Sequence, residues 1–151
     1  MTNESPPDAP ASGDLTSEAS NLRIATFRLA RRMRTQRAVD SMSDGQFAVL
    51  AVLWTFGDHA LSELAERERI SPPAMNRTVN CLETSGYLSR NADESDGRKV
   101  VISLTDEGRA VVKETARRRD AWVEEALDDL DATQRDVLAA AAVLMQRMVD
   151  R

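Results

Sequence analysis

The stretch from Leu61 to Thr105 constrains the fold more than any other, because two helical patterns and a strand pair follow one another without spare residues. Apolar residues recur at helical spacing from Leu61 to Ala65, and the segment 71–73, Ser-Pro-Pro, then resets the phase. The next helical stripe consists of Met75, Thr78, Val79 and Leu82. Two helices joined by a tight turn are therefore predicted.

Two β-prone runs, 87–91 and 99–104, follow this helix pair and bracket the turn-forming segment 92–97. Asp, Ser and Gly in such a segment favour a reversal between antiparallel strands. The order of two helices and a hairpin predicts a winged helix-turn-helix, in which the hairpin loop is the wing. The expected fold class is mainly α with a small β-hairpin, an α+β arrangement.

Helical patterns also precede this unit. Residues 1–15 are rich in Pro and poor in large apolar groups, so a disordered leader is expected. Residues 16–42 hold a first long helix, expected to be capped at Thr16 or Ser17 and to run to about Ala38.

The reading unit is expected to span residues 43–104. Ser43 and Asp44 predict the cap of a helix over 45–56, which is apolar almost all round and is therefore expected to be buried. Residues 57 and 58, Gly-Asp, are expected to end it.

Residues 105–151 are predicted to form two further helices, the first capped at Thr105 and running to about Leu130, the second starting at 131–133. The residues of the first expected to face inward are Val112, Ala116, Val123, Leu127 and Leu130. The apolar residues of the second are Val137, Leu138, Ala141, Leu144, Met145 and Met148. The helices at both ends carry more apolar surface than one small domain can hide, which predicts a homodimer.

Composition places the chain among globular proteins of one domain, with 151 residues, 42% of them hydrophobic and 30% charged. The longest uncharged apolar stretch, 47–56, is far short of the roughly 20 residues that span a bilayer. Without an apolar leader, a cytoplasmic protein with no membrane contact is expected. The single cysteine, Cys81, excludes an intrachain disulfide, and the single histidine, His59, excludes a multi-histidine metal site. No metal or other cofactor is expected.

The net charge of −5 argues against nucleic-acid binding when it is taken alone, because neutralising phosphates supplies most non-specific affinity. Much of the acidity, however, lies in residues 120–136 and in the first twenty residues. The segment 62–104 is not basic either. Affinity for DNA would therefore rest on geometry and a few contacts, doubled in a dimer.

Four short motifs in this order resemble the MarR (multiple antibiotic resistance regulator) family. They are S-E-L-A-E-R at 62–67, Leu82-Glu83 with Gly86, Asp96-Gly97-Arg98, and Leu104-Thr105 with Gly108. The resemblance covers roughly residues 20–149. It implies a dimeric transcription regulator, most often a repressor, which binds double-stranded DNA and loses affinity when a small ligand binds.

The second helix of the pair is expected to enter a major groove, with Ser71 as N-cap and Pro72 in the first helical position. Its outer face consists of Pro73, Ala74, Asn76, Arg77, Asn80 and Cys81. Arg77 can donate bidentately to guanine, Asn76 can read adenine, and a small apolar residue can touch a thymine methyl group. Each side chain can instead reach only phosphate or water, and Ser71 can be a cap with no DNA contact.

Arg98 matches the wing arginine of the family, which implies insertion into a narrow, A·T-rich minor groove. Asp96 would orient that guanidinium or hold the hairpin, and the alternative is an Asp96–Arg98 pair that only shapes the turn. Lys99 and Arg90 are expected to contact phosphates. The predicted operator is a pseudo-palindrome.

The sequence departs from the family at Cys81, where a basic residue is common, and at Pro72 and Pro73, where polar residues are common. Its operator preference is therefore not transferable from relatives. A thiol-based redox sensor acting through Cys81 is an alternative, although such sensors carry their cysteine near the start of the first helix. An incidental thiol is the simpler interpretation.

The resemblance also implies a ligand pocket between the dimer helices and the reading unit. Its candidate residues are Phe27, Arg31, Met42, Phe47, Trp54 and His59. This aromatic set with one cation would suit an anionic, phenolic ligand, but ordinary core packing and a surface charge explain the same residues.

Catalysis is not indicated. The chain has no Ser/His/Asp order, no Gly-rich phosphate loop and no pair of carboxylates in an apolar setting. A winged helix that binds proteins and no longer touches DNA is the remaining alternative, because the reading unit is weakly basic.

Overall fold

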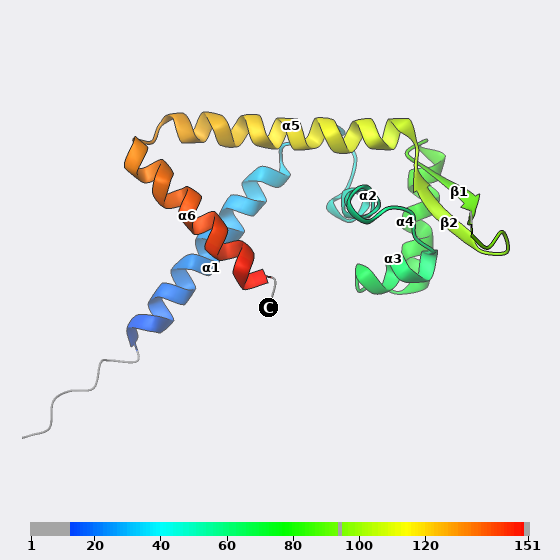
Figure 1. Cartoon of the computed structure of the whole chain (residues 1–151), viewed down its shortest axis with the longest axis horizontal. Helices are drawn as coiled ribbons and strands as arrows, with labels where there is room; N and C mark the ends of the chain where they lie inside the picture. The colour runs from blue at the N-terminus through cyan, green and yellow to red at the C-terminus, as the bar shows by residue number, and fades with distance from the viewer. Residues whose placement is uncertain (1–12, 94, 150–151) are drawn as a thin grey trace, which may run out of the picture. The chain divides into compact units, whose positions relative to one another are not determined.

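The computed structural model describes residues 13–93 and 95–149. Its elements are α1 (Gly13–Arg34), α2 (Asp44–Phe56), α3 (Leu61–Arg67), α4 (Pro72–Thr84), β1 (Leu88–Ala92), β2 (Val100–Leu104), α5 (Asp106–Asp128) and α6 (Ala132–Val149) (Figure 1). Helices with one antiparallel strand pair in the described residues confirm the predicted fold class.

Contacts divide the chain into two units, residues 1–35 and 36–151. The first unit contains α1, whose last turn carries Arg31, Arg32 and Arg34. The prediction placed its start at Thr16 or Ser17, but it begins at Gly13; residues 1–12 of the expected leader lie outside the described residues.

The predicted end of this helix near Ala38 is wrong, because α1 stops at Arg34. Thr35 closes the last turn, since both its backbone N–H and its Oγ1 donate to the Arg32 carbonyl, at 3.2 and 2.7 Å. In the second unit, the backbone N–H of Ala38 donates to Thr115 Oγ1 of α5 at 3.2 Å. A bond to α5 thus takes the place of a further helical turn.

The cap of α2 is confirmed as a capping box. Ser43 Oγ accepts from the backbone of Gln46 at 3.1 Å, and the Gln46 side chain accepts from the backbone of Ser43 at 2.8 Å. Gly57 ends the helix with a φ of 83°.

The expectation that α2 is buried all round is wrong at its C-terminal turn, where Trp54 is 43% and Phe56 55% exposed. Charged side chains lie over these rings: Lys113 Nζ is 5.6 Å from the Trp54 ring centre, and the Arg67 guanidinium carbon is 3.8 Å from that of Phe56. Long cationic side chains can cover apolar rings in this way while keeping their charges in water.

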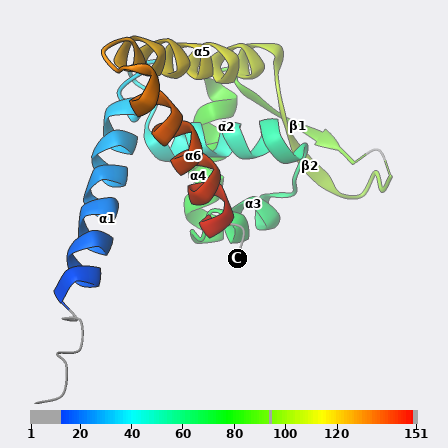
Figure 2. The same ribbon diagram turned by 60° about the vertical axis from the view of Figure 1, so that its left-hand side comes forward.

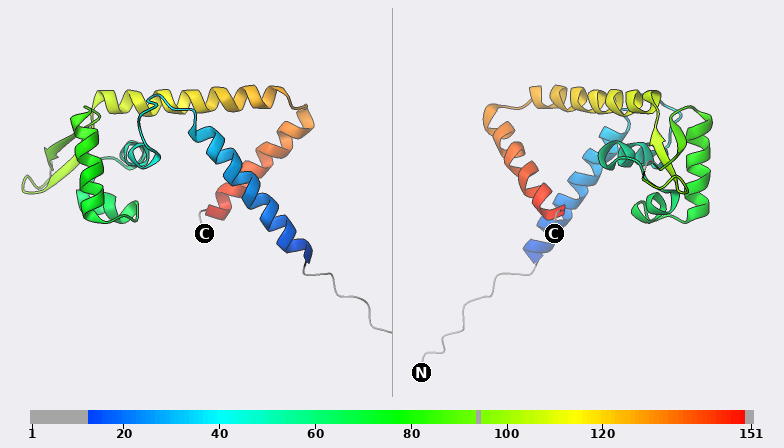
Figure 3. Two further views of the ribbon diagram at one scale, coloured as in Figure 1. Left: turned by 180° about the vertical axis from the view of Figure 1, so that it is seen from behind. Right: turned by 45° about the vertical axis from the view of Figure 1, so that its right-hand side comes forward.

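One core joins α2, α3, α4, the hairpin and the beginning of α5. Its buried apolar residues are Met42, Val49, Leu50, Leu53, Leu64, Ala65, Met75, Val79, Leu82, Leu88, Ile102, Leu104, Val111 and Val112. The left view of Figure 3 shows α4 between the hairpin and α2, and α4 packs against both. The core therefore fixes α4 relative to the hairpin.

The hairpin pairs Leu88 with Leu104 and Arg90 with Ile102. Its strands begin one residue later than the predicted runs at 87 and 99. His59 adds a short bridge to Ile102, with backbone bonds of 3.3 and 2.8 Å. Figure 2 shows the hairpin projecting beyond the helices of the reading unit.

Two glycines shape the ends of the hairpin. Gly86, with a φ of 81°, follows α4 and allows Tyr87 N–H to reach the Leu82 carbonyl at 2.9 Å, a Schellman turn. Gly108 lies so close to the hairpin that a Cβ there would stand 2.2 Å from the Tyr87 carbonyl oxygen. The first turn of α5 can therefore dock only through a residue without a side chain.

The inner half of α5 is packed, with Gly108, Val111, Val112 and Thr115 buried. Of the five residues expected to face inward, Val112 is buried, Val123, Leu127 and Leu130 are half-buried, and Ala116 is exposed. In α6 no residue is buried. Among the described residues, no helix combines the length and apolar character required to cross a membrane.

Candidate nucleic-acid interface

The inner and outer faces of α4 are those that the sequence predicts. Met75, Val79 and Leu82 are buried and Thr78 is half-buried. The outer residues Pro73, Asn76, Arg77, Asn80 and Cys81 are exposed, whereas Ala74 is half-buried. A polar stripe along a packed helix is the arrangement that can enter a major groove.

Ser71 is an N-cap, as predicted. Its Oγ accepts from the backbone N–H of Ala74 at 3.4 Å, and Pro72 and Pro73 occupy the first helical positions. Proline costs nothing there, because the first N–H groups of a helix have no partner within it. A contact between Ser71 and DNA stays a prediction.

Arg90 of β1 reaches across to α4 and forms a cluster that the sequence analysis did not predict. Its Nη2 donates to Asn76 Oδ1 at 3.1 Å and to Asn80 Oδ1 at 2.8 Å, and its Nη1 pairs with the Glu83 carboxylate. We call Arg90, Asn76, Asn80 and Glu83 the Arg90 cluster. Arg90 was expected to be a phosphate contact, but the structure places its guanidinium among three side chains of α4.

Strand alternation is a partial signal for this cluster, because it puts Arg90 on the same face of β1 as the buried Leu88. Arg90 lies opposite Ile102, with Leu88 two residues earlier pairing with Leu104. The sequence places Arg90 on a strand, but it does not show which helix that strand lies against. Contacts between elements that are separate in sequence depend on tertiary packing.

The wing loop is held by its own aspartates. Asp96 Oδ1 accepts from the backbone of Arg98 at 3.2 Å, and the Asp96 carbonyl accepts from Lys99 at 2.8 Å. Asp93 accepts from Ser95 and Asp96, and these bonds, led by that of the Ser95 hydroxyl, lower the pKa of Asp93. Asp96 therefore orders the turn through backbone, which fits the hairpin-holding role among those predicted.

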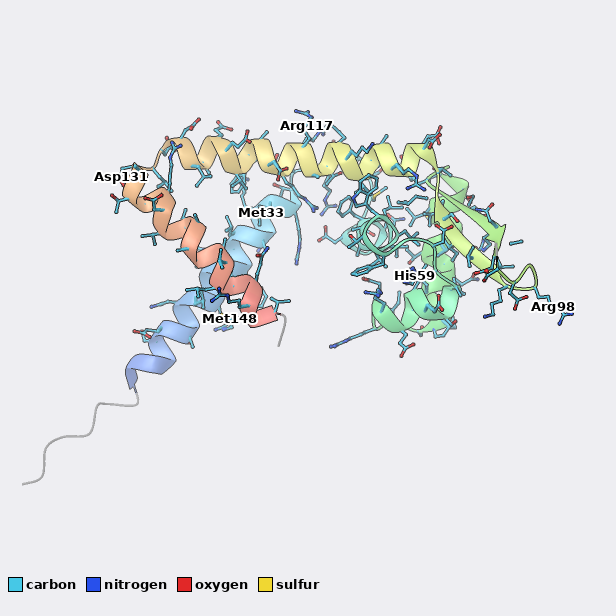
Figure 4. The ribbon with its side chains drawn as sticks, viewed as in Figure 1. Met33, His59, Arg98, Arg117, Asp131 and Met148 are labelled. Carbon is cyan, nitrogen blue, oxygen red and sulfur yellow. The ribbon has the colours of Figure 1, made fainter. Side chains whose placement is uncertain are left out.

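The cations of the wing extend into solvent. Arg98 and Lys99 are exposed, and Figure 4 shows Arg98 at the outer end of the hairpin, directed away from the helices. Within the described residues, Asp96 and Arg98 form no side-chain ion pair. The Arg98 guanidinium is thus placed to reach a surface beyond the protein.

Cys81 is exposed, and its sulfur accepts from Gln46 Nε2 at 3.1 Å. This bond joins α4 to the start of α2. The Gln46 amide is a neutral donor, so this contact places no charge next to the thiol. A redox function for Cys81 stays an alternative to the incidental thiol.

Four of the six candidate ligand residues belong to the second unit, and a pocket shared by all six stays a prediction. Met42 is in the core at 5% exposure, and Phe47 is half-buried with the Arg119 guanidinium 4.6 Å from its ring centre. Trp54 and His59 line separate hollows. The remaining two candidates, Phe27 and Arg31, are exposed residues of α1, in the other unit.

The hollow beside Trp54 measures about 530 Å³. Its lining residues are Trp54, Val112, Lys113, Ala116, Arg117, Asp120, Ala121 and Glu124. The hollow at His59 is lined by Glu63, Glu66 and Arg67 in addition. Among the described residues, no three acidic, histidine or cysteine side chains form a group that would hold a metal ion.

Comparison with known proteins agrees with this arrangement. The model of the MarR family matches residues 42–100. An uncharacterised HTH-type transcriptional regulator of Mycobacterium bovis is 36% identical over 132 residues, which cover 87% of this chain and 92% of that protein.

Solved structures show the same fold. A Pseudomonas aeruginosa protein described as a transcriptional regulator has a TM-score of 0.83 at 31% identity, over 94% of this chain and 99% of that one. A MarR family protein of Bacillus stearothermophilus has a TM-score of 0.79 at 20% identity, over 95% of this chain and 100% of that one. This chain belongs to the MarR family of DNA-binding transcription regulators.

Proposed function

We propose that this protein is a homodimeric repressor that binds a pseudo-palindromic operator. In this proposal α4 lies in the major groove and Arg98 enters the flanking minor groove. The observation that carries it is the pairing of a polar outer face on α4 with a projecting hairpin whose terminal cation is exposed. Both parts rest on one core, so they can engage DNA together.

Unpartnered apolar surface supports the homodimer. The exposed large apolar residues of α6 are Val137, Leu138, Val143, Leu144, Met148 and Val149. Those of α1 are Leu22, Ile24, Phe27 and Leu29. Two copies related by a twofold axis would place two α4 helices in successive major grooves, about 34–36 Å apart.

The repressor role draws support from a relative. The protein MdtR of Bacillus subtilis, 32% identical over 102 residues, is named a transcriptional repressor. A dimer bound to an operator that overlaps a promoter would also repress transcription from that promoter.

A small-molecule effector belongs to the proposal. DNA binding by BpsR of Bordetella bronchiseptica, a protein of the same fold at 24% identity, is described as regulated by 6-hydroxynicotinic acid. In this chain the hollow beside Trp54 combines an aromatic ring with the Lys113 ammonium, which lies 5.6 Å from the ring centre, and its lining includes Arg117 as well as Asp120 and Glu124. An anionic aromatic molecule of similar size matches that pairing.

The test is Arg98→Ala on operators selected from a genomic library. Because a narrow A·T-rich minor groove concentrates negative potential, we expect the affinity loss to be greatest on A·T-flanked operators. Replacing the flank with G·C pairs should reproduce much of that loss with wild-type protein. Fluorescence anisotropy over a salt series measures both effects.

Lys99→Ala is the matched control. If Lys99 meets only phosphate, its loss should weaken binding on all sequences alike and lower the salt slope by about one unit. Arg98→Ala protein that binds both flanks as wild type does would contradict the wing assignment. A wild-type protein without salt-dependent DNA binding would favour the protein-interaction alternative.

A further inference from the structure

We propose that Arg90 determines the base preference of α4 by holding the side-chain oxygens of Asn76 and Asn80, so that these asparagines offer N–H donors to the DNA. This inference rests on the proposed placement of α4 in the major groove. It assigns a specificity role to a residue of β1 that does not itself need to touch a base.

The geometry of the Arg90 cluster supports a fixed arrangement. Asn76 and Asn80 are one helical turn apart on α4, and a single guanidinium nitrogen, Nη2, lies 3.1 and 2.8 Å from their Oδ1 atoms. The Glu83 carboxylate holds the other terminal nitrogen. The side chains of Arg90 and Glu83 are 31% and 37% exposed, so the ion pair is partly shielded from water.

The orientation of both amides follows from the chemistry of arginine. A guanidinium group carries only donors, so the atom that each asparagine turns toward it must be the acceptor oxygen. Charge-assisted bonds of this kind are stronger than those between neutral groups. Both Nδ2 groups therefore face away from the guanidinium, while each Oδ1 has one of its two lone pairs engaged by the cation.

Adenine recognition by asparagine needs both ends of the amide, because the oxygen accepts from adenine N6 while the nitrogen donates to N7. In the Arg90 cluster the oxygens already accept from a cation, which competes with adenine N6. The N–H donors match base edges that present only acceptors in the major groove, namely guanine N7 and O6 or thymine O4. We therefore expect guanine or thymine, not adenine, opposite Asn76 and Asn80, which revises the adenine interpretation of Asn76.

The experiment compares base preferences selected from a randomised operator library by wild type, Arg90→Met and Arg109→Met. Methionine resembles the apolar stem of Arg90 but has no donor. Arg109 is exposed on α5 and serves as the control for the loss of one positive charge. We expect wild type and Arg109→Met to share guanine or thymine at the two positions, and Arg90→Met to gain adenine there by roughly 5- to 150-fold.

Arg90→Lys provides a second variant if Arg90→Met folds poorly, since lysine keeps the charge but lacks the fork that places one nitrogen on the two amides and the other on Glu83. Side-chain amide resonances of Asn76 and Asn80 give a readout without DNA: they should shift in both Arg90 variants and stay in place in Arg109→Met. Unchanged adenine preference in the folded Arg90 variants, or adenine selected by wild type, would overturn the inference.

The two failures are distinguishable. A wild-type protein that selects no sequence would overturn the proposed function together with the base preference. Amide resonances that do not respond to either Arg90 variant would overturn the Arg90 cluster alone, whatever the protein does with DNA.

Discussion

The reading unit and α6 use apolar residues in opposite ways. In the reading unit Leu50, Leu64, Met75 and Val79 are each 0% exposed, whereas in α6 Leu138 is 48% and Leu144 58% exposed. Both regions are helical and both are rich in aliphatic side chains. The difference fits the proposed homodimer, in which the reading unit is stable within a single chain and α6 is covered by a partner surface. The stability of the first should not depend on protein concentration, and that of the second should.

The largest expected effect is on association. Leu138→Asp combined with Leu144→Asp would place two carboxylates in the proposed dimer interface, where burying unpaired charge is costly. We expect the dimer dissociation constant to rise by a factor of about 1,000 or more, equivalent to about 4 kcal/mol. Light scattering across a dilution series measures this.

Gln146→Asp is the control, because Gln146 is an exposed polar residue of the same helix. It should leave association close to wild type. If the wild-type protein is monomeric at micromolar concentration, the claim that a second copy covers α6 is wrong.

The next effect is on the core of the reading unit. Leu50 is 0% exposed, so Leu50→Ala should lower the free energy of unfolding by about 2–5 kcal/mol through the cavity it leaves. Val149→Ala removes two methyl groups at a site that is 82% exposed and should change little. Urea denaturation at two protein concentrations measures both variants. If the loss of unfolding free energy in Leu50→Ala grows on dilution, the reading unit also depends on a partner.

A smaller effect is expected where α5 meets the hairpin. A Cβ at Gly108 would stand 2.2 Å from the Tyr87 carbonyl oxygen and 3.1 Å from Leu104 Cδ2. Gly108→Ala should therefore destabilise the fold by about 1–3 kcal/mol, the usual range for overpacking. Gly97→Ala is the matched control, because nothing lies within 4 Å of the added Cβ there. Equal melting temperatures for the two variants would contradict the close approach.

The smallest effect concerns Glu114 on the outside of α5. Hydrogen bonds from Arg117 and then Arg118 lower the pKa of this carboxyl from 4.5 to about 2. A lowered pKa means that the ion pairs stabilise the folded state above pH 4.5, and that this contribution is lost as the pH falls toward 2.

Glu114→Gln should thus be less stable than wild type at neutral pH, and the difference should disappear through this acid range. Because the pairs are exposed, the difference should be small and should shrink in high salt. Melting temperatures of both proteins from pH 7 downward measure it. A difference that persists at the acid end would point to packing of the Glu114 stem instead.

Local signals made most of the reading unit predictable. Ser43, Ser71 and Thr105 were identified as caps from their place before apolar periodicity, and each accepts the expected backbone hydrogen bond. The inner face of α4 followed from its 3.6-residue spacing. These features depend on neighbours within about four residues, so a single sequence contains them.

Features that depend on distant residues were not predictable in the same way. The sequence placed the end of the first helix near Ala38, but that residue bonds to Thr115, far along the chain. Likewise the family resemblance proposes Phe47, Trp54 and His59 for one pocket, but their immediate contacts in this chain, an Arg119 guanidinium and two separate hollows, come from distant residues. Which apolar side chains share a cavity is determined by packing, not by residue type.

The direct junction between β2 and α5 has a mechanical consequence. Only Thr105, the cap of α5, separates Leu104 at the end of β2 from Asp106 at the start of the helix, and Gly108 is held against Tyr87 at the base of the hairpin. With its 23 residues, α5 is a rod of about 35 Å. A tilt of about 5° would displace one end of such a rod by about 3 Å relative to the other. Because only one residue separates α5 from β2, a tilt of α5 about its C-terminal end would move the base of the hairpin as well. The groove that Arg98 can reach would then change.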